Sequence, residues 1–174
     1  PVLAANAQAT DEVLREAAAG RGALYGWQRM TLPRLAAVIA EQDLARRGLA
    51  PMSPLASEAL VARVVHRLRG EGGLPRFQTV ADGPGFARAV ARTLLELRLA
   101  GIEPGSPGLH APELSALLRV YEQELERAGL ADRATVYRMA GAIARDRAAR
   151  HPLLDVPVLI LDVDAPTPAE RGLI

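Results

Sequence analysis

The sequence predicts an α/β protein that is predominantly helical, with a short, mainly parallel sheet of about three strands and a large all-helical insertion. Strand-like apolar segments occur only near the two ends of the 174-residue chain, whereas the apolar residues of 53–150 follow helical spacing throughout. A helical insertion inside an α/β layer is the simplest account of this order. We therefore expect residues 1–52 and 151–174 to form a partial α/β domain and residues 53–150 to form an inserted helical subdomain.

The N-terminal part alternates strand and helix. Residues 1–6 form an apolar segment typical of a short buried strand, which runs directly into a helix over about 8–19. A second strand is expected within 23–31, followed by a helix from 32 to about 45 with Pro33 in its first turn. Because the chain opens on a strand without a preceding tail, we expect it to be a fragment of a larger protein.

The middle of the chain carries several helix start and stop signals. Ser53 and Pro54 form a cap-plus-proline start after a turn at 48–53, and Asp132 is a second N-cap candidate. Gly101 and Gly129 follow apolar periodic segments and are expected to end helices. The predicted helices are 54–69, 86–100, about 114–128 and 132 to about 150.

The C-terminal part contains the most apolar segment, 157–162, which ends in Asp162. A continuous apolar run of this length is typical of a parallel strand that helices cover on both faces. Thr167 and Pro168 then begin a final helix.

Composition excludes several classes of function. All 21 basic residues are Arg, so a P-loop, which requires a Lys on the terminal phosphates, is absent and the chain is not an autonomous P-loop ATPase. Cysteine is absent, which removes disulfides and thiolate metal sites. No apolar run is long enough for a membrane span and no signal segment opens the chain, so we expect a cytoplasmic protein without membrane contact. The net charge of +1 predicts that any contact with DNA is local.

Metal and nucleophile motifs are also missing. The three histidines lie in separate segments without metal-ligand spacing. Asp162 and Asp164 could suggest a divalent-metal site and a small enzyme, but no third ligand is evident. We therefore predict no catalytic residue and no metal site in this chain.

Segment 2–14, a strand that leads into an Ala-rich helix with Asp11 and Glu12, resembles motif Ia of UvrD-like, superfamily 1 helicases. The resemblance implies that the strand-to-helix turn touches the DNA backbone. Free amides at a helix N-terminus can bind phosphate, and Asn6 could add a side-chain donor. An ordinary strand–turn–helix capped by Asn6 would explain the same residues.

Segment 28–36 is similar to the next element of that family, a strand that ends in Thr before a Leu-rich helix. The resemblance places Thr31 near the path of the DNA. Arg34 could pair with a phosphate, although a capped helix with a solvated Arg is the simpler reading.

Segment 159–170 resembles motif II, the Walker B strand, of the same helicases. By this resemblance Asp162 matches the magnesium-binding Asp, and Val163 stands where the water-orienting Glu should be. The closing Thr167–Glu170 looks like the Thr-Pro-Gln-Glu stretch of AddB-type nuclease subunits, with one residue fewer after Asp162. Asp162 is thus expected to be a relic of a nucleotide and magnesium site.

The helical stretch is similar to the inserted helical subdomain of the AddB group. A Gly-Phe start, a Glu-Leu-Arg helix, a Tyr helix and a Gly-x-x-Asp turn occur in the family's order at Phe86, 96–98, Tyr121 and 129–132. Each of these residues would also suit an ordinary helical core, so only their order is informative.

Together the motifs imply an AddB-like fragment that extends from motif Ia to motif II of a DNA-repair and recombination helicase–nuclease subunit. Its expected role is scaffolding and guidance of single-stranded DNA, with single- or double-stranded DNA ends and a helicase–nuclease partner subunit as partners. ATP and magnesium would belong only to an intact, active homologue. The alternative is a helical protein-interaction module without DNA contact.

The hypothesis makes two structural demands. The strand that ends at Asp162 must lie in one sheet with, and close to, the strand that precedes Asn6. Because the strand of the missing first motif would be absent, the sheet should also have an exposed edge, which favours a homodimer of the isolated fragment.

Overall fold

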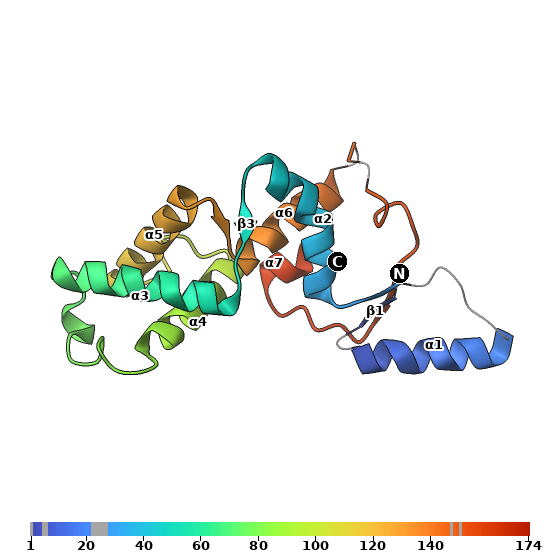
Figure 1. The fold of residues 1–174 in the computed structure, drawn as a ribbon, viewed down its shortest axis with the longest axis horizontal. Helices are drawn as coiled ribbons and strands as arrows, with labels where there is room; N and C mark the ends of the chain where they lie inside the picture. Colours follow the sequence, from blue (N-terminus) through green and yellow to red (C-terminus); the bar gives the residue numbers. More distant parts are fainter. Residues whose placement is uncertain (1, 5–6, 22–27, 147, 150) are drawn as a thin grey trace. The chain divides into compact units, whose positions relative to one another are not determined.

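The computed structural model describes residues 2–4, 7–21, 28–146, 148–149 and 151–174. Within these residues the chain is mostly helical with short parallel strands, which confirms the predicted fold class (Figure 1). The chain divides into two compact units, one formed by Pro1–Asp43 with Tyr137–Ile174 and the other by Leu44–Val136. The division resembles the expected one of an α/β layer interrupted by a helical insertion, with the insertion bounded at 44 and 136 in place of 53 and 150.

The first unit is built around a three-stranded parallel sheet in the order β2-β1-β5. Strand β1 pairs Val2 with Arg29 on one side and with Leu159 on the other. The strands are β1 (Val2–Ala4), β2 (Arg29–Met30) and β5 (Leu159–Leu161). The helices that belong wholly or mostly to this unit are α1 (Ala7–Arg21), α2 (Leu32–Arg46), α6 (Arg133–Arg145) and α7 (Pro168–Arg171).

Strand β5 is parallel, as predicted, but the expectation that helices cover it on both faces is wrong. The side chains of Val158, Leu159 and Ile160 are 38%, 40% and 43% exposed. β5 lies at the edge of the sheet and pairs only with β1, so its other flank has no strand among the described residues. An apolar run indicates that a strand is hydrophobic but does not indicate its position in the sheet. The burial of β5 was therefore predicted to be greater than it is.

The C-terminal helix α7 is short and firmly capped. Thr167 and Glu170 form a capping box, in which the Thr167 hydroxyl accepts from the Glu170 amide and the Glu170 carboxylate accepts from the Thr167 amide over 3.1 Å. At the other end, Arg145 Nη1 donates to the carbonyl oxygen of Gly172 over 2.7 Å. The predicted start of a final helix at Thr167 and Pro168 is therefore confirmed.

Two helix ends differ from the sequence expectation. Helix α1 ends at Arg21, about two residues beyond the expected end near 19. Helix α6 ends at Arg145 and does not reach 150, because the carboxylate of Asp146 accepts from the amide of Ala148 over 2.9 Å and begins a turn.

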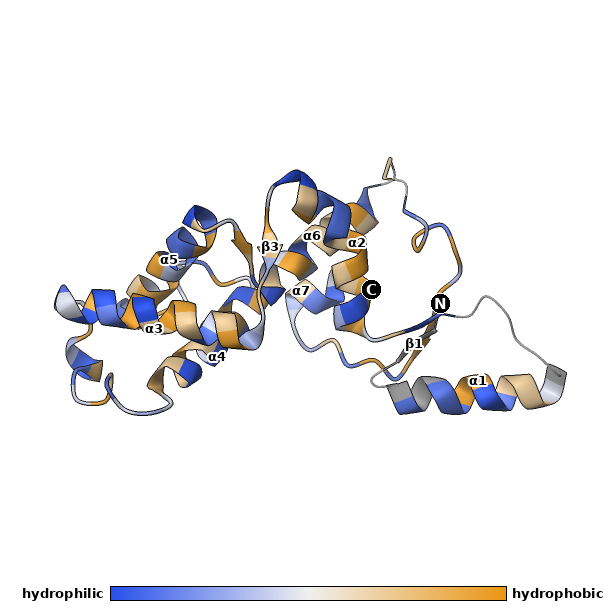
Figure 2. Ribbon diagram, viewed as in Figure 1, coloured by the Kyte–Doolittle hydropathy of each residue, from blue (hydrophilic) through white to orange (hydrophobic). Residues whose placement is uncertain are grey.

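The second unit packs three amphipathic helices around one core. They are α3 (Pro54–Gly70), α4 (Phe86–Leu99) and α5 (Pro112–Arg127), with a short 3₁₀ helix at Pro75–Phe77. Apolar and polar residues alternate along each helix at helical spacing (Figure 2). The Ser53 hydroxyl accepts from the Ala56 amide over 3.2 Å, which confirms the predicted cap. The largest fully buried side chains of this unit are Val61, Val64, Leu74, Leu94, Leu117, Leu118 and Tyr121.

A two-stranded ladder in this unit was missed by the sequence analysis, which expected only a turn and helices here. Strands β3 (Ala50–Pro51) and β4 (Leu130–Ala131) pair in parallel. The Ala50 amide donates to the Gly129 carbonyl over 2.8 Å. Strands of two residues leave no period-2 pattern that a sequence could reveal. Gly129, with φ of +60°, lets the chain turn from α5 into this ladder.

Among the described residues, none of the helices has the length and apolar character needed to cross a bilayer.

Candidate nucleic-acid interface

The sheet of the first unit brings two of the predicted site segments to one edge. Strands β2, β1 and β5 are parallel, so their carboxyl ends point the same way. Thr31 follows Met30, which pairs with Leu3, and Asp162 follows Leu161, which pairs with Ala4. Thr31 and Asp162 therefore flank the end of β1 from its two sides. In parallel sheets this edge is the usual place for a ligand.

Of the three predicted DNA-contact residues, the structure describes Thr31 and Arg34. Asn6 lies outside the described residues. Thr31 is half-buried, and its carbonyl accepts from the Leu35 amide over 2.9 Å as α2 begins. Arg34 lies in the first turn of α2 with its side chain exposed to solvent. Thr31 and Arg34 thus sit where a helix starts at the carboxyl edge of the sheet, which is the arrangement that suits a phosphate contact.

Asp162 adopts an uncommon backbone conformation. Its φ is +44°, and it is the one non-glycine residue with positive φ in the described part of the chain. A left-handed conformation is tolerated by Asp better than by most residues but still costs free energy. Such strain is often found at functional sites, so Asp162 is marked by geometry as well as by its place after β5.

The carboxylates near β5 do not assemble into a metal centre. Asp162 and Asp164 are exposed, and Val163 between them is half-buried. No group of three or more His, Cys, Asp or Glu side chains that could hold a metal ion occurs among the residues that the structure describes. Within the described part of the chain, these two aspartates therefore lack a third protein ligand.

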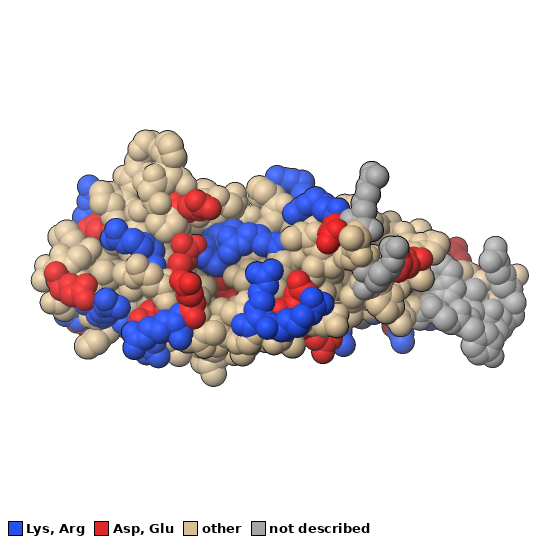
Figure 3. Space-filling view, turned by 90° about the horizontal axis from the view of Figure 1, so that it is seen from above, with Lys and Arg blue, Asp and Glu red and all other residues tan. Residues whose placement is uncertain are grey.

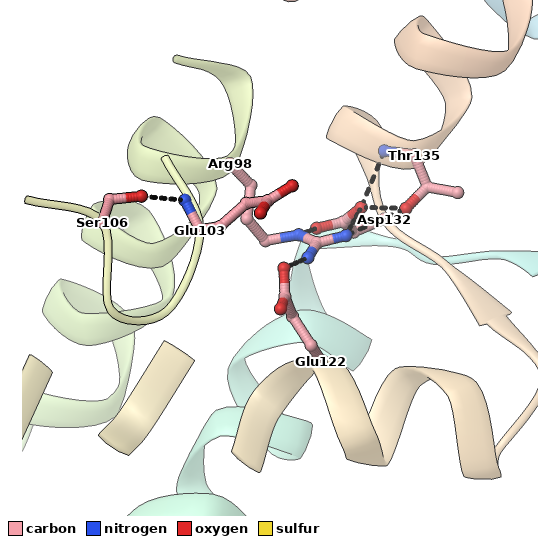
Figure 4. Close-up of polar contacts among 6 residues, drawn as sticks. All are labelled: Arg98, Glu103, Ser106, Glu122, Asp132 and Thr135. Carbon is pink, nitrogen blue, oxygen red and sulfur yellow. Dashed lines mark hydrogen bonds and ion pairs between the residues drawn. The ribbon is translucent and has the colours of Figure 1, made fainter. Parts of the chain in front are cut away.

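A second polar cluster lies inside the helical unit and is centred on Arg98 (Figure 4). Arg98 extends from the last turn of α4, and its Nε donates to Asp132 Oδ2 over 2.7 Å. Its Nη1 also pairs with Glu122 of α5, and its Nη2 donates to Thr135 Oγ1 over 3.1 Å. Arg98 and Asp132 are 4% and 3% exposed. The cluster therefore joins α4, α5 and the start of α6 through one nearly buried cation.

Tyr121 completes this cluster. The guanidinium carbon of Arg98 lies 5.9 Å from the centre of the Tyr121 ring, and the Tyr121 hydroxyl lies 3.4 Å from the Ser57 hydroxyl. Burial, together with the charge of Asp132, raises the pKa of Tyr121 to about 12. Burial alone would lower the pKa of Arg98, but the hydrogen bond to Asp132 and the charges of Asp132 and Glu122 raise it above its usual value. Arg98 is thus a fixed cation.

The sequence identified only part of this cluster. The predicted N-cap role of Asp132 is confirmed, because its Oδ1 accepts from the Thr135 amide over 2.9 Å. The role of Arg98 was missed. A signal was present, since Arg98 continues the buried row that Val90 and Leu94 begin at four-residue spacing. A charged residue at such a position needs a buried partner.

Charges of both signs are interleaved on the face shown in Figure 3, as the net charge of +1 would suggest. Comparisons of the chain with protein-family models and with curated proteins gave no match.

Proposed function

We propose that this chain is an AddB-like fragment, the catalytically inactive helicase-like part of a DNA double-strand-break processing subunit. It scaffolds that subunit and guides single-stranded DNA past the carboxyl edge of its sheet. DNA ends and a helicase–nuclease partner subunit are its partners, and Thr31, Arg34 and Asn6 are its DNA contacts. The proposal is carried by the sequence resemblance and by one structural observation, the pairing of β1 with β5.

The pairing of β1 with β5 supports the proposal because the hypothesis requires it and a different sheet order would have contradicted it. The strand that ends at Asp162 had to share a sheet with the strand that precedes Asn6. The two strands are direct neighbours, with Val2 opposite Leu159 and Ala4 opposite Leu161. Residues more than 150 positions apart in the sequence are thus adjacent, as a motif Ia strand beside a motif II strand requires.

One residue supports the inactive version. Val163 stands where the resemblance puts the water-orienting Glu, and a Val side chain cannot orient a water molecule for attack on a phosphate. Asp162 is then a remnant of the nucleotide site. Hydrolysis of ATP would require groups that these residues do not contain.

The Arg98 cluster gives weaker support. Three of the elements that carry the resemblance in the helical stretch, represented by Arg98, Tyr121 and Asp132, meet in one buried contact group. The same cluster would also stabilise an unrelated helical unit.

One observation favours the alternative of a protein-interaction module without DNA contact. On the face shown in Figure 3, acidic side chains lie among the basic ones. In this reading the helical unit binds a partner protein, and the Arg34 side chain is only solvated.

Binding to a labelled single-stranded oligonucleotide, measured by fluorescence anisotropy over a range of salt concentrations, separates the two. Phosphate contacts predict that log K falls with log salt by about 0.7 for each contact on single-stranded DNA. Arg34→Ala should weaken binding and reduce this slope, whereas Arg92→Ala on α4, an exposed Arg with 80% of its side chain accessible, should not. Absence of salt-dependent binding by the unmodified chain would favour the interaction module and refute the proposal.

A further inference from the structure

Three arginines of the helical unit surround a single carboxylate on the face where α3 and α5 pack together. Arg63 and Arg67 lie one turn apart on α3, and Arg127 lies in the last turn of α5, one turn after Glu124. Arg63 Nη2 is 2.5 Å, Arg127 Nη1 3.3 Å and Arg67 Nη1 3.6 Å from the nearest Glu124 oxygen. Basic side chains from both helices thus lie around the Glu124 carboxylate.

The carboxylate and the arginines differ sharply in exposure. The side chain of Glu124 is 10% exposed, whereas those of Arg63, Arg67 and Arg127 are 66%, 50% and 77% exposed. Each guanidinium has five N–H donors in a planar fork. Arg63 and Arg127 each donate one hydrogen bond to Glu124, and Arg67 forms an ion pair with it over 3.6 Å. Glu124 is therefore the shared, nearly buried partner of three largely exposed guanidinium groups.

The charges in this cluster do not cancel. Besides Glu124, one further carboxylate takes part, because Arg67 Nε donates to Glu71 Oε1 over 3.1 Å. Three positive charges face two negative ones, which leaves an excess of one positive charge. The four side chains and Val64 line an open hollow of about 570 Å³.

We propose that this hollow, lined by Arg63, Arg67 and Arg127, binds a backbone phosphate of single-stranded DNA. The inference rests on the proposed function for its ligand and adds a contact site on the helical unit, where none was expected. Phosphate suits the site better than a carboxylate does. Several guanidinium forks from two helices can each donate to a different phosphate oxygen, which is the geometry that makes Arg the preferred residue for phosphate.

The Glu124 carboxylate allows two variants with opposite expected effects on DNA binding. Removing the arginines alone would leave the buried Glu124 carboxylate without partners, so the test variant combines R63Q, R67Q and R127Q with E124Q. This variant loses three positive charges and one negative charge, a net loss of two. The matched control is R88Q/R92Q on α4, which also removes two positive charges from exposed arginines paired with single glutamates.

Anisotropy titrations of the full 174-residue chain with the labelled oligonucleotide provide the readout. The quadruple variant should bind roughly tenfold more weakly than R88Q/R92Q, with a salt slope lower by about 0.7. E124Q alone should bind more tightly than the unmodified chain, because it removes the competing negative charge while the amide oxygen of the introduced side chain can still accept hydrogen bonds from the arginines. Equal losses in the quadruple variant and the control, or an unchanged affinity for E124Q, would overturn the proposal.

Further outcomes distinguish failure of this site from failure of the proposed function, and a phosphate ligand from a carboxylate ligand. If Arg34→Ala weakens binding and the quadruple variant binds like its control, the DNA function stands and the hollow is no part of it. If the unmodified chain does not bind the oligonucleotide, both fall. Displacement of the oligonucleotide by poly-glutamate as effectively as by unlabelled oligonucleotide would identify a carboxylate site and overturn the phosphate assignment.

Discussion

Arg98 donates from its Nε to Asp132 Oδ2 over 2.7 Å, and both side chains are almost completely excluded from solvent. The pair spans 34 positions of the sequence and links the end of α4 to the start of α6. A buried ion pair of this kind is costly to break, because the remaining partner keeps its charge without compensation. The stability of the helical unit should therefore depend strongly on these two residues.

Arg98→Met should lower the free energy of unfolding by about 3–5 kcal/mol, since it leaves the Asp132 carboxylate buried beside Glu122. Urea unfolding followed by circular dichroism measures the loss. Arg92→Met, on the exposed face of the same helix, should change stability by less than about 0.5 kcal/mol. The double variant Arg98→Met/Asp132→Asn should recover part of the loss. Equal stabilities of the two single variants would show that the pair contributes little.

Tyr121 predicts an alkaline transition. The pKa of its hydroxyl is raised from about 10 in an unfolded chain to about 12, so the folded state holds the proton more tightly. The resulting stabilisation is fully present below about pH 10 and is lost as the pH rises through about 12. Two pKa units correspond to roughly 3 kcal/mol.

Unfolding experiments between about pH 10 and pH 12 test this dependence. The stability of the unmodified chain should fall more steeply over this window than that of Tyr121→Phe, which has no hydroxyl to ionise. In the variant, the tyrosinate absorbance of the native protein should likewise lose a component that appears near pH 12. Parallel pH profiles of the two proteins would contradict the assignment.

Gly141 in α6 and Gly172 after α7 approach each other closely in the first unit. A Cβ at position 141 would lie 2.8 Å from the Gly172 carbonyl oxygen, which is closer than such atoms normally come. Gly→Ala within a helix usually stabilises a protein by roughly 1 kcal/mol, but here a shift of α7 would be needed. We expect Gly141→Ala to destabilise by about 1–3 kcal/mol.

Gly20→Ala serves as the matched control, because Gly20 also lies within a helix and nothing lies within 4 Å of its added Cβ. This variant should be stabilised, so the same substitution should have opposite signs at the two positions. Thermal unfolding of both variants provides the comparison. Stabilisation by Gly141→Ala would mean that α7 moves away without cost.

Local signals made much of the fold predictable from the sequence. Ser53 with Pro54 and Thr167 with Pro168 gave correct helix starts, because capping depends on residues only three positions apart. Glycines at 101 and 129 likewise marked helix ends through positive φ. The strands near residues 3, 30 and 160 were found as well, since each lies within a segment expected to be a strand, 1–6, 23–31 and 157–162.

Long-range features could not be predicted in the same way. The partners of Arg98 come from α5 and from the turn before α6, and no local pattern names them. The exposure of Ile160 depends on the place of β5 in the sheet, which its own residues do not encode. The arginines around Glu124 were unremarkable in sequence, because their convergence depends on how α3 packs against α5.

The last prediction concerns the backbone of Asp162. With φ of +44°, this residue pays for a left-handed conformation that glycine adopts freely, so Asp162→Gly should stabilise the chain by up to about 1 kcal/mol. Asp164→Gly, two residues on at a position without positive φ, should be neutral or destabilising, because glycine there only adds freedom to the unfolded chain. Urea unfolding of the two variants, each against the unmodified protein, gives the difference. A higher free energy of unfolding for Asp162→Gly would mean that the aspartate lowers the stability of the chain, as expected of a residue inherited from a ligand site. A loss would indicate that its side chain stabilises the end of β5, and the strain would then have no functional meaning.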